Sequence, residues 1–297
     1  MAGPELHCID LDLMNRPGFR RFMSAWLYRD RDLAFLVDPG PLATTPHLLA
    51  ELRRLAVDRL DYILLTHIHI DHAGGTAAVL EHYPDARVIC HPDGIRHLVD
   101  PARLWQGSRS VLGTLADDYG EILPVAAGRI AFAAEIGTSG LRAFLTPGHA
   151  PHHCCYLLGD LLFAGEVAGV RCDVANGIYL RPATPPKFLL DVARTSIEQM
   201  LALEPRRMVF AHYGLVATAM DHLRIARDQL GLWVDGVRCL QGTAADDLDT
   251  AFFHWLLDHD PNFGTFVQLP PDIRARERQF LGNSLRGMQE YVTTTAS

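Results

Sequence analysis

Short apolar runs separated by polar turns predict strands in the first forty residues. Each run is of strand length and ends at a turn-forming residue, as in RDRD at positions 29–32 and DPG at 38–40. This arrangement predicts a meander of strands rather than the opening of a dinucleotide-binding fold. The predicted strands are 7–13, 24–28 and 33–37.

Helical spacing of apolar residues first appears over 44–57, behind Thr44, and the buried strand 61–65 follows. Helices alternate with short strands from there to about residue 165. Two groups of strands, each followed by helices, predict a mixed α/β fold, a four-layer αββα sandwich in which two sheets pack face to face. Further strands are predicted around 129–134, 141–148, 154–159 and 161–165, and further helices over 76–83, 93–99 and 102–116.

The pattern changes after about residue 214, because the remaining chain shows helical periodicity alone. Three amphipathic stretches, 216–237, 246–258 and 272–292, carry it. We therefore expect a catalytic domain over 1–214 and a C-terminal helical module over 215–297. The module would cover or flank the edge that carries the active site, or form a homodimer through its apolar face.

Composition and charge narrow the classes of function. The 297 residues are 48% hydrophobic and 21% charged, as in ordinary globular proteins, and the formal net charge is -8. An acidic chain repels polyphosphates, so we expect a small-molecule substrate and no nucleic acid. No long apolar segment, secretion leader or CxxC pair is present among these residues, which favours a cytoplasmic protein without a membrane span and disfavours β-lactam hydrolysis.

The densest cluster of candidate chemistry is THIHIDHAGG, which directly follows the strand 61–65. His67 and His69 point to one side of the strand end, and the chain then turns so that Asp71 and His72 face a second point. Imidazole nitrogens and carboxylate oxygens are ligands that zinc prefers, and Gly74 and Gly75 allow a close backbone turn. Fifteen histidines in the chain do not make such a cluster expected by chance.

This motif resembles the signature of the metallo-β-lactamase superfamily, and three further segments follow in that family's order: FLVDPG, TPGHAPHH and FAHYG. The resemblance covers most of residues 1–214 and implies a metallo-hydrolase similar in organisation to the glyoxalase II and lactonase branches. It also implies two metal ions, most simply zinc, with iron or manganese as alternatives. One ion would be held by His67, His69 and His149, and the other by Asp71, His72 and His212.

The chain departs from the family's pattern at one ligand. Where the family has an aspartate that bridges both metals, LLFAGEVAG offers Glu166, which has one more methylene. We expect Glu166 to be a ligand, either bridging both ions or binding one. Asp160 is the competing acid, but its position in LLGDLL is typical of a hairpin turn.

Several nearby residues are candidates for supporting roles. Asp38 and Asp61 would orient ligand histidines or cap backbone groups, and one of His152 and His153 would lie behind the metal ligands. Tyr213 or Tyr179 would donate a hydrogen bond to a developing oxyanion, although a tyrosine beside a ligand can equally serve packing.

The expected reaction is hydrolysis of a small ester, such as a thioester or lactone, by metal-activated water, with Asp71 holding the attacking water. Two alternatives remain open: an iron-dependent oxidoreductase on the same fold, and a metal-binding regulatory protein without catalysis. Arg181 and Lys187 could contact an anionic part of the substrate, and aromatic residues of the C-terminal module could line an apolar pocket, although surface and core roles fit them as well. The aromatic residues are Trp233, Phe252, Phe253 and Trp255.

Overall fold

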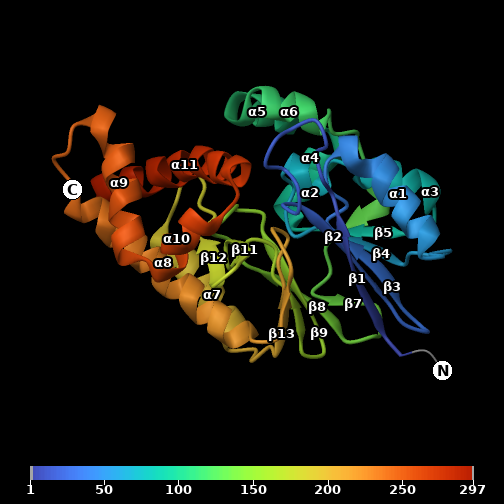
Figure 1. Cartoon of the computed structure of the whole chain (residues 1–297). Coiled ribbons are helices and arrows are strands. Elements are labelled where there is room, and N and C mark those ends of the chain that lie inside the picture. Colours follow the sequence, from blue (N-terminus) through green and yellow to red (C-terminus); the bar gives the residue numbers. More distant parts are fainter. Residues whose placement is uncertain (1–2, 296–297) are drawn as a thin grey trace. The chain divides into compact units, whose positions relative to one another are not determined.

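The computed structural model describes residues 3–295, with residues 245 and 246 described by their backbone alone. Internal contacts divide the chain into two compact units (Figure 1). The first unit comprises Met1–Leu145 and His152–Gly159, and the second comprises Thr146–Pro151 and Asp160–Ser297. The chain therefore passes into the second unit, returns for one strand, and then stays in the second unit.

A six-stranded sheet in sequence order forms the centre of the first unit. The first three strands pair antiparallel, as the predicted meander requires, and the others add in parallel. Strand β3 is buried along its whole length, which explains its unbroken apolar run, because a strand that is covered on both faces alternates no polar positions. The strands are β1 (Glu5–Asp10), β2 (Ser24–Arg29), β3 (Ala34–Val37), β4 (Tyr62–Leu64), β5 (Arg87–Ile89) and β6 (Ile130–Ala131).

Helices connect the parallel strands of this sheet. Helix α1 begins behind Thr44 as predicted and buries Leu48, Leu49 and Leu52. Gly113 has a φ of 58° and divides the single helix predicted over 102–116 into α5 and α6. The helices are α1 (Thr45–Arg54), α2 (Ile70–Ala73), α3 (Thr76–His82), α4 (Pro92–Val99), α5 (Ala102–Leu112) and α6 (Thr114–Tyr119), with 3-10 turns at Leu42–Thr44 and Ala127–Arg129.

The first unit also contains three antiparallel strands, β7 (Glu135–Ile136), β8 (Leu141–Leu145) and β9 (Cys154–Leu158). The one hydroxyl proton of the buried Tyr156 of β9 is shared between the carbonyls of Leu65 and Ile89, with the oxygen atoms 2.7 and 3.0 Å apart. These two bonds join β9 to the ends of β4 and β5, so the segment that contains His152 and His153 is fixed against the end of β4.

The second unit has a small sheet, a hairpin and most of the long helices. Strand β10 (Leu161–Phe163) runs parallel to β13 (Arg207–Val209), which pairs with β14 (Leu215–Val216). Strands β11 (Val170–Val174) and β12 (Gly177–Arg181) form a separate hairpin. Sequence reasoning did not predict this hairpin, because RCDV and GIYLR are short and carry charges within the strand.

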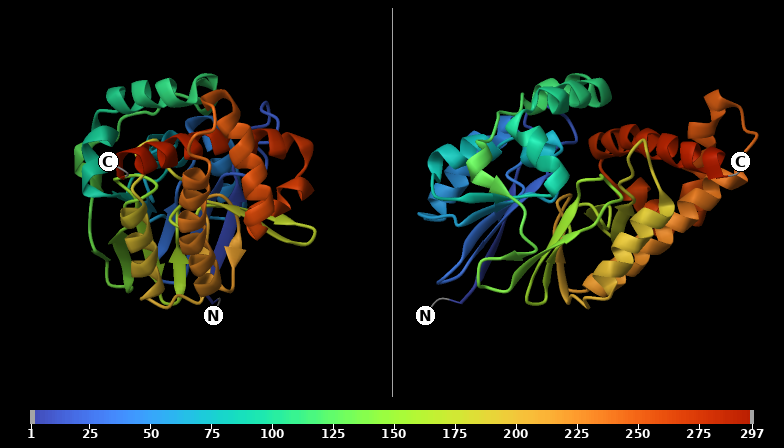
Figure 2. Two further views of the ribbon diagram at one scale, coloured as in Figure 1. Left: turned by 90° about the vertical axis from the view of Figure 1, so that its left-hand side faces the viewer. Right: turned by 180° about the vertical axis from the view of Figure 1, so that it is seen from behind.

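Helices α7 (Leu190–Leu201) and α8 (Ala219–Cys239) run side by side in the second unit (Figure 2). The C-terminal region continues with α9 (Ala245–His259), α10 (Pro261–Gly264), a 3-10 turn (Thr265–Gln268) and α11 (Pro271–Thr295). The helical character predicted beyond residue 214 thus begins at Ala219. Within residues 3–295, none of the helices combines the length and the hydropathy that crossing a bilayer requires.

The aromatic residues of the helical region mainly form its core. Trp233 and Phe252 have no exposed surface, and their rings pack edge to face with centroids 5.7 Å apart. The Trp233 indole donates to the buried Asp260 at 2.7 Å, and that carboxylate also caps α10. The core interpretation of these aromatic residues is therefore confirmed for Trp233 and Phe252.

Candidate metal centre

The histidine–aspartate motif of the first unit lies between β4 and the short helix α2. His67 and His72 are buried, His69 is the residue that precedes α2, and Asp71 is in its first turn. The donor atoms of His67 and His69 lie within 4.8 Å of each other, and so do those of Asp71 and His72. The motif therefore presents two pairs of donors, as its spacing predicts.

Asp38, at the end of β3, organises this motif from behind. Its carboxylate accepts hydrogen bonds from the Thr66 backbone at 2.8 Å, from the Thr66 hydroxyl at 2.6 Å and from the His72 ring at 3.1 Å. The bonded ring atom is Nδ1, and a carboxylate accepts rather than donates. A neutral His72 therefore carries its proton on Nδ1 and presents the lone pair of Nε2.

Thr66 fixes the position of the ring proton of His67 in the same way. Because the Thr66 hydroxyl gives its proton to Asp38, its oxygen can only accept from Nδ1 of His67, which lies 3.1 Å away. His67 therefore also presents its Nε2 lone pair, the form in which a neutral imidazole binds a metal ion. Asp38 orients two candidate ligands as expected, whereas Asp61 accepts from the Ala34 backbone and Arg59. The sequence reasoning missed Thr66, although it immediately precedes the motif.

The glycines after the motif allow another loop to approach closely. A Cβ added to Gly74 would lie 3.1 Å from Cα of Pro41, and one added to Gly75 would lie 3.2 Å from the carbonyl oxygen of Pro39 and 2.7 Å from the Thr45 hydroxyl. The Gly75 amide donates to the carbonyl of Gly40 at 2.7 Å. The DPG loop and the metal-binding motif are thus held together through positions where no side chain fits.

His152 and His153 lie behind the motif. The His153 ring is fully buried with its centroid 5.6 Å from that of His67, and the His152 ring is 5.5 Å from that of His69. The two rings surround the candidate ligands of the first unit and restrict their rotation.

In the second unit, Glu166 follows β10, and its carboxylate faces two histidines. Its Oε2 atom lies 2.9 Å from Nε2 of His149, and its Oε1 atom lies 3.6 Å from Nε2 of His212. His212 follows β13, the parallel neighbour of β10, and both Glu166 and His212 are buried. Asp160, the competing acid, instead forms an ion pair with Arg207 at 2.7 Å.

The donor set of the second unit fits a bound cation. Nδ1 of His149 lies 3.1 Å from the carbonyl oxygen of Ala183, which can only accept, so the ring proton is on Nδ1. Nε2 of a neutral His149 then presents a lone pair toward a carboxylate oxygen, an arrangement that a shared divalent cation stabilises. Glu166 has one oxygen toward each histidine, so the extra methylene does not prevent contact with two separate ligands.

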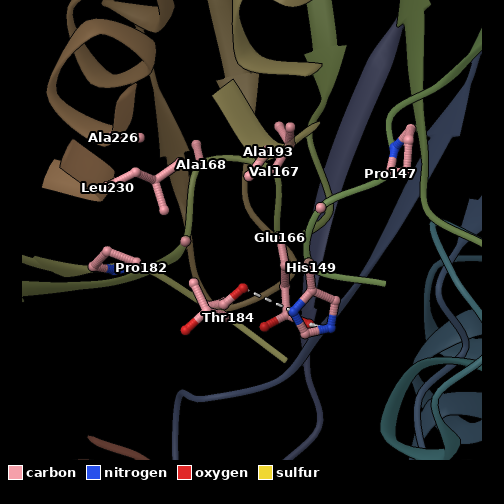
Figure 3. A pocket seen from close by; sticks show the side chains of 13 residues that line it. Pro147, His149, Glu166, Val167, Ala168, Pro182, Thr184, Ala193, Ala226 and Leu230 are labelled. Atoms are coloured by element: carbon pink, nitrogen blue, oxygen red, sulfur yellow. Dashed lines mark hydrogen bonds and ion pairs between the residues drawn. The ribbon is translucent and has the colours of Figure 1, made fainter. Parts of the chain in front are cut away.

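A small pocket of about 20 Å³ lies beside these ligands and is lined by apolar and small residues (Figure 3). This volume is enough for about one water molecule. Thr184 lies at the same end of the pocket as Glu166 and His149, and its buried hydroxyl has no hydrogen-bond partner among the described residues. Sequence reasoning did not single out Thr184, because no motif includes it.

The other residues considered as substrate contacts differ in their exposure to solvent. Tyr213 is half-buried beside His212, and Lys187 is exposed. Tyr179 is fully buried and donates to Glu277 at 3.2 Å, and Arg181 is buried in an ion pair with the same carboxylate. The suggested roles of Tyr179 in oxyanion binding and of Arg181 in substrate binding are therefore wrong, since Glu277 already occupies both side chains.

A family model for the metallo-beta-lactamase superfamily matches residues 19–212, more than half of the chain, so the chain belongs to this superfamily. A crystal structure of an archaeal member, ST1585 from Sulfolobus tokodaii, superposes with a TM-score of 0.69. It is 23% identical and covers 98% of this chain and 99% of its own. The predicted fold class, with its C-terminal helical region, is confirmed.

Curated relatives include proteins with different names. A metallo-beta-lactamase fold-containing protein, ST1585 of Sulfurisphaera tokodaii, is 32% identical over 60% of this chain and 72% of its own length. A hydroxyacylglutathione hydrolase of Aeromonas salmonicida is 32% identical over 48% of this chain, and a thioesterase, pkgB, of Emericella nidulans is 30% identical over 58%. The match spans 44% of each of these two relatives, less than half their length.

Proposed function

We propose that the chain is a metal-dependent hydrolase of small esters, with thioesters and lactones as the substrate class. Its candidate ligands would hold two divalent ions, most simply zinc. By the family's pattern, one ion would be bound by His67, His69 and His149 and the other by Asp71, His72 and His212, with Glu166 as a ligand of one ion or of both. Residues 1–214 would contain the catalytic machinery, and residues 215–297 would flank it.

The orientation of the histidines carries this proposal. Three rings have Nδ1 bound to an acceptor oxygen, supplied by Thr66 for His67, Asp38 for His72 and Ala183 for His149. A protein gains from fixing the tautomer of several neighbouring histidines when all of them must present Nε2 to a metal ion. The names of the hydrolase and thioesterase relatives support an ester as the substrate.

When bound, two divalent ions lower the pKa of a water molecule and polarise the substrate's carbonyl oxygen. The protein's own residues would then complete the reaction. Asp71 would accept a hydrogen bond from the attacking water and hold it in line, because its side chain retains 18% exposure while His72 beside it is buried. Tyr213 would donate a hydrogen bond to the developing oxyanion.

Hydrolysis of a substrate panel tests this proposal. Thioesters, lactones and phosphodiesters should be offered to metal-depleted protein and to the same protein after metal is restored. We expect hydrolysis of at least one thioester or lactone by the restored protein alone. Restored protein that binds two ions but hydrolyses none of the panel would contradict the proposed activity and favour a regulatory role, and bound iron with redox turnover would favour the oxidoreductase alternative.

A further inference from the structure

The segment between β12 and α7 holds the His149 ring. Beyond Arg181, the last residue of β12, the chain forms neither strand nor helix until α7 begins at Leu190. Within this stretch the carbonyl of Ala183 accepts the Nδ1 proton of His149 at 3.1 Å. The direction of the His149 ring therefore depends on a segment that no strand pairing keeps in place.

Helix α11 binds Arg181, the residue just before this segment, through a buried charged cluster. Glu277 is fully buried, and its carboxylate accepts from the Tyr179 hydroxyl at 3.2 Å and from the Arg181 guanidinium. Arg276 of the same helix adds a 2.8 Å bond to the other carboxylate oxygen. The Arg181 guanidinium also donates to the carbonyl of Pro182 at 3.2 Å, so the cluster reaches the residue next to Ala183.

The same helix meets the end of the segment through direct packing. A Cβ added to Gly287 would lie 2.1 Å from the carbonyl oxygen of Pro185 and 3.3 Å from Cβ of Phe188. One turn further, the Tyr291 ring packs edge to face on Phe188, with centroids 5.7 Å apart. Helix α11 thus fixes the segment on both sides of Ala183, and Gly287 permits the close approach.

We propose that helix α11 is a positioning element for His149: through Glu277 and Gly287 it fixes the segment 182–188, whose Ala183 carbonyl sets the direction of the imidazole. This inference rests on the proposed function only where it treats His149 as a metal ligand. It assigns to the C-terminal helix a role in the metal centre that requires no contact between the helix and a metal ion or substrate.

Two glycine-to-alanine variants of α11 provide a matched test. Gly287→Ala pushes a methyl group into the Pro185 carbonyl and should displace the segment. Gly282→Ala adds the same methyl group to the same helix, where the nearest atoms are 3.9 Å away. Both substitutions raise helix propensity equally, so they differ only in what the new methyl group meets.

Zinc affinity should be measured by competition with a chromophoric chelator, and cobalt-substituted protein should be examined by its visible spectrum. We expect Gly287→Ala to weaken zinc binding about tenfold or more, the usual effect of disturbing a residue that orients a ligand. The cobalt spectrum should change as well, whereas Gly282→Ala should match the wild type in both measurements. Equal affinity and equal spectra for the two variants would overturn the proposal.

A measurement on metal-free protein separates this inference from the proposed function. Two-bond proton–nitrogen NMR reports the tautomer of each histidine, and His149→Ala identifies the His149 signal. We expect the same His149 signal in the wild type and in Gly282→Ala, and a shifted or mixed signal in Gly287→Ala. Should the wild type bind no metal, the proposed function fails, while an unchanged His149 signal in Gly287→Ala would refute the positioning role.

If Gly287→Ala does not fold, Tyr291→Ala tests the same proposal with a smaller change in packing. It removes the ring contact with Phe188 and leaves the glycine and the charged cluster intact. We expect a smaller loss of zinc affinity, about twofold to fivefold by comparison with the tenfold loss usual for ligand-orienting residues. Thr293→Ala, at an exposed position on the same turn of the helix, is its control, and equal affinities would count against the proposal.

Discussion

Oε2 of Glu166 lies 2.9 Å from Nε2 of His149, while Oε1 of the same carboxylate lies 3.6 Å from Nε2 of His212. Glutamate thus reaches both candidate ligand histidines of the second unit from a position where the family pattern has an aspartate. The longer side chain need not abolish a bridging role, because each oxygen faces a different candidate ligand.

Removing the charge of Glu166 should therefore weaken metal binding while the fold is kept. We expect Glu166→Gln to lower zinc affinity about tenfold to a hundredfold, since an amide oxygen is a much weaker ligand than a carboxylate. The measurement is chelator competition, with Asp160→Asn as the control, because Asp160 pairs with Arg207 instead. Equal affinity in the two variants would remove Glu166 from the ligand set.

The hydroxyl of Thr66 should matter to metal binding without touching the metal. Thr66→Val keeps the shape of the side chain but removes the group that links Asp38 to His67. We expect zinc affinity to fall about tenfold and the free energy of unfolding to fall by about 2 kcal/mol, since the lost bond to Asp38 is to a charged group. Thr265→Val removes a hydroxyl of the C-terminal region that bonds only the backbone carbonyls of Ile178 and Asn262. This variant should lose stability without losing zinc affinity.

Acid should weaken the second unit through Glu277. Burial alone raises the pKa of this carboxyl, but the adjacent Arg181 and Arg276 outweigh burial and lower the pKa from 4.5 to about 2. A lowered folded-state pKa contributes stability that is fully present above pH 4.5 and disappears as the pH falls toward 2. The contribution is about 3 kcal/mol.

NMR of carbon-13-labelled glutamate carboxyls in metal-free protein can follow this titration, with Glu277→Gln identifying the signal. We expect the Glu277 carboxyl to stay ionised at pH 3.5, where exposed glutamates are mostly protonated. A Glu277 midpoint near 4.5 would show that the arginine pair does not stabilise its charge.

The buried Trp233 indole should contribute to stability and not to chemistry. Trp233→Phe removes its hydrogen bond to Asp260 and leaves the carboxylate's bonds to the α10 backbone. We expect the free energy of unfolding to fall by about 2 kcal/mol, since the lost bond is to a charged group. Thermal or urea unfolding measures this, and a loss of zinc affinity at full folding would contradict the purely structural role.

The sequence predicted the elements with strong periodicity and missed those that depend on tertiary contacts. Apolar runs located β3 and β4, and helical spacing located α1 and α11 within a few residues. The strands of the hairpin β11–β12 contain charged residues. Arg171 and Arg181 can be buried there because they form ion pairs with Asp173 and Glu277. The partner of Arg181 lies 96 residues further along the chain and leaves no local pattern.

The candidate ligands could be predicted because they stand in compact motifs, whereas the residues that orient them, apart from Asp38, could not. Thr66, Ala183 and Glu277 act through hydrogen bonds that exist only in the folded chain. Arg181 was misread for the same reason: its charge suggested a surface contact with substrate, while Glu277, almost a hundred residues later, buries it. Backbone carbonyls such as that of Ala183 carry no signal in sequence at all.

Metal stoichiometry tests the central claim most directly. Elemental mass spectrometry should be applied to protein purified without added metal and to metal-depleted protein saturated with zinc, for the wild type, His69→Ala and His149→Ala. We predict two divalent ions in each wild-type chain and a loss of metal in both variants. A wild type that binds no zinc at saturation, or variants that keep both ions, would contradict the assignment of these side chains as a dinuclear metal centre.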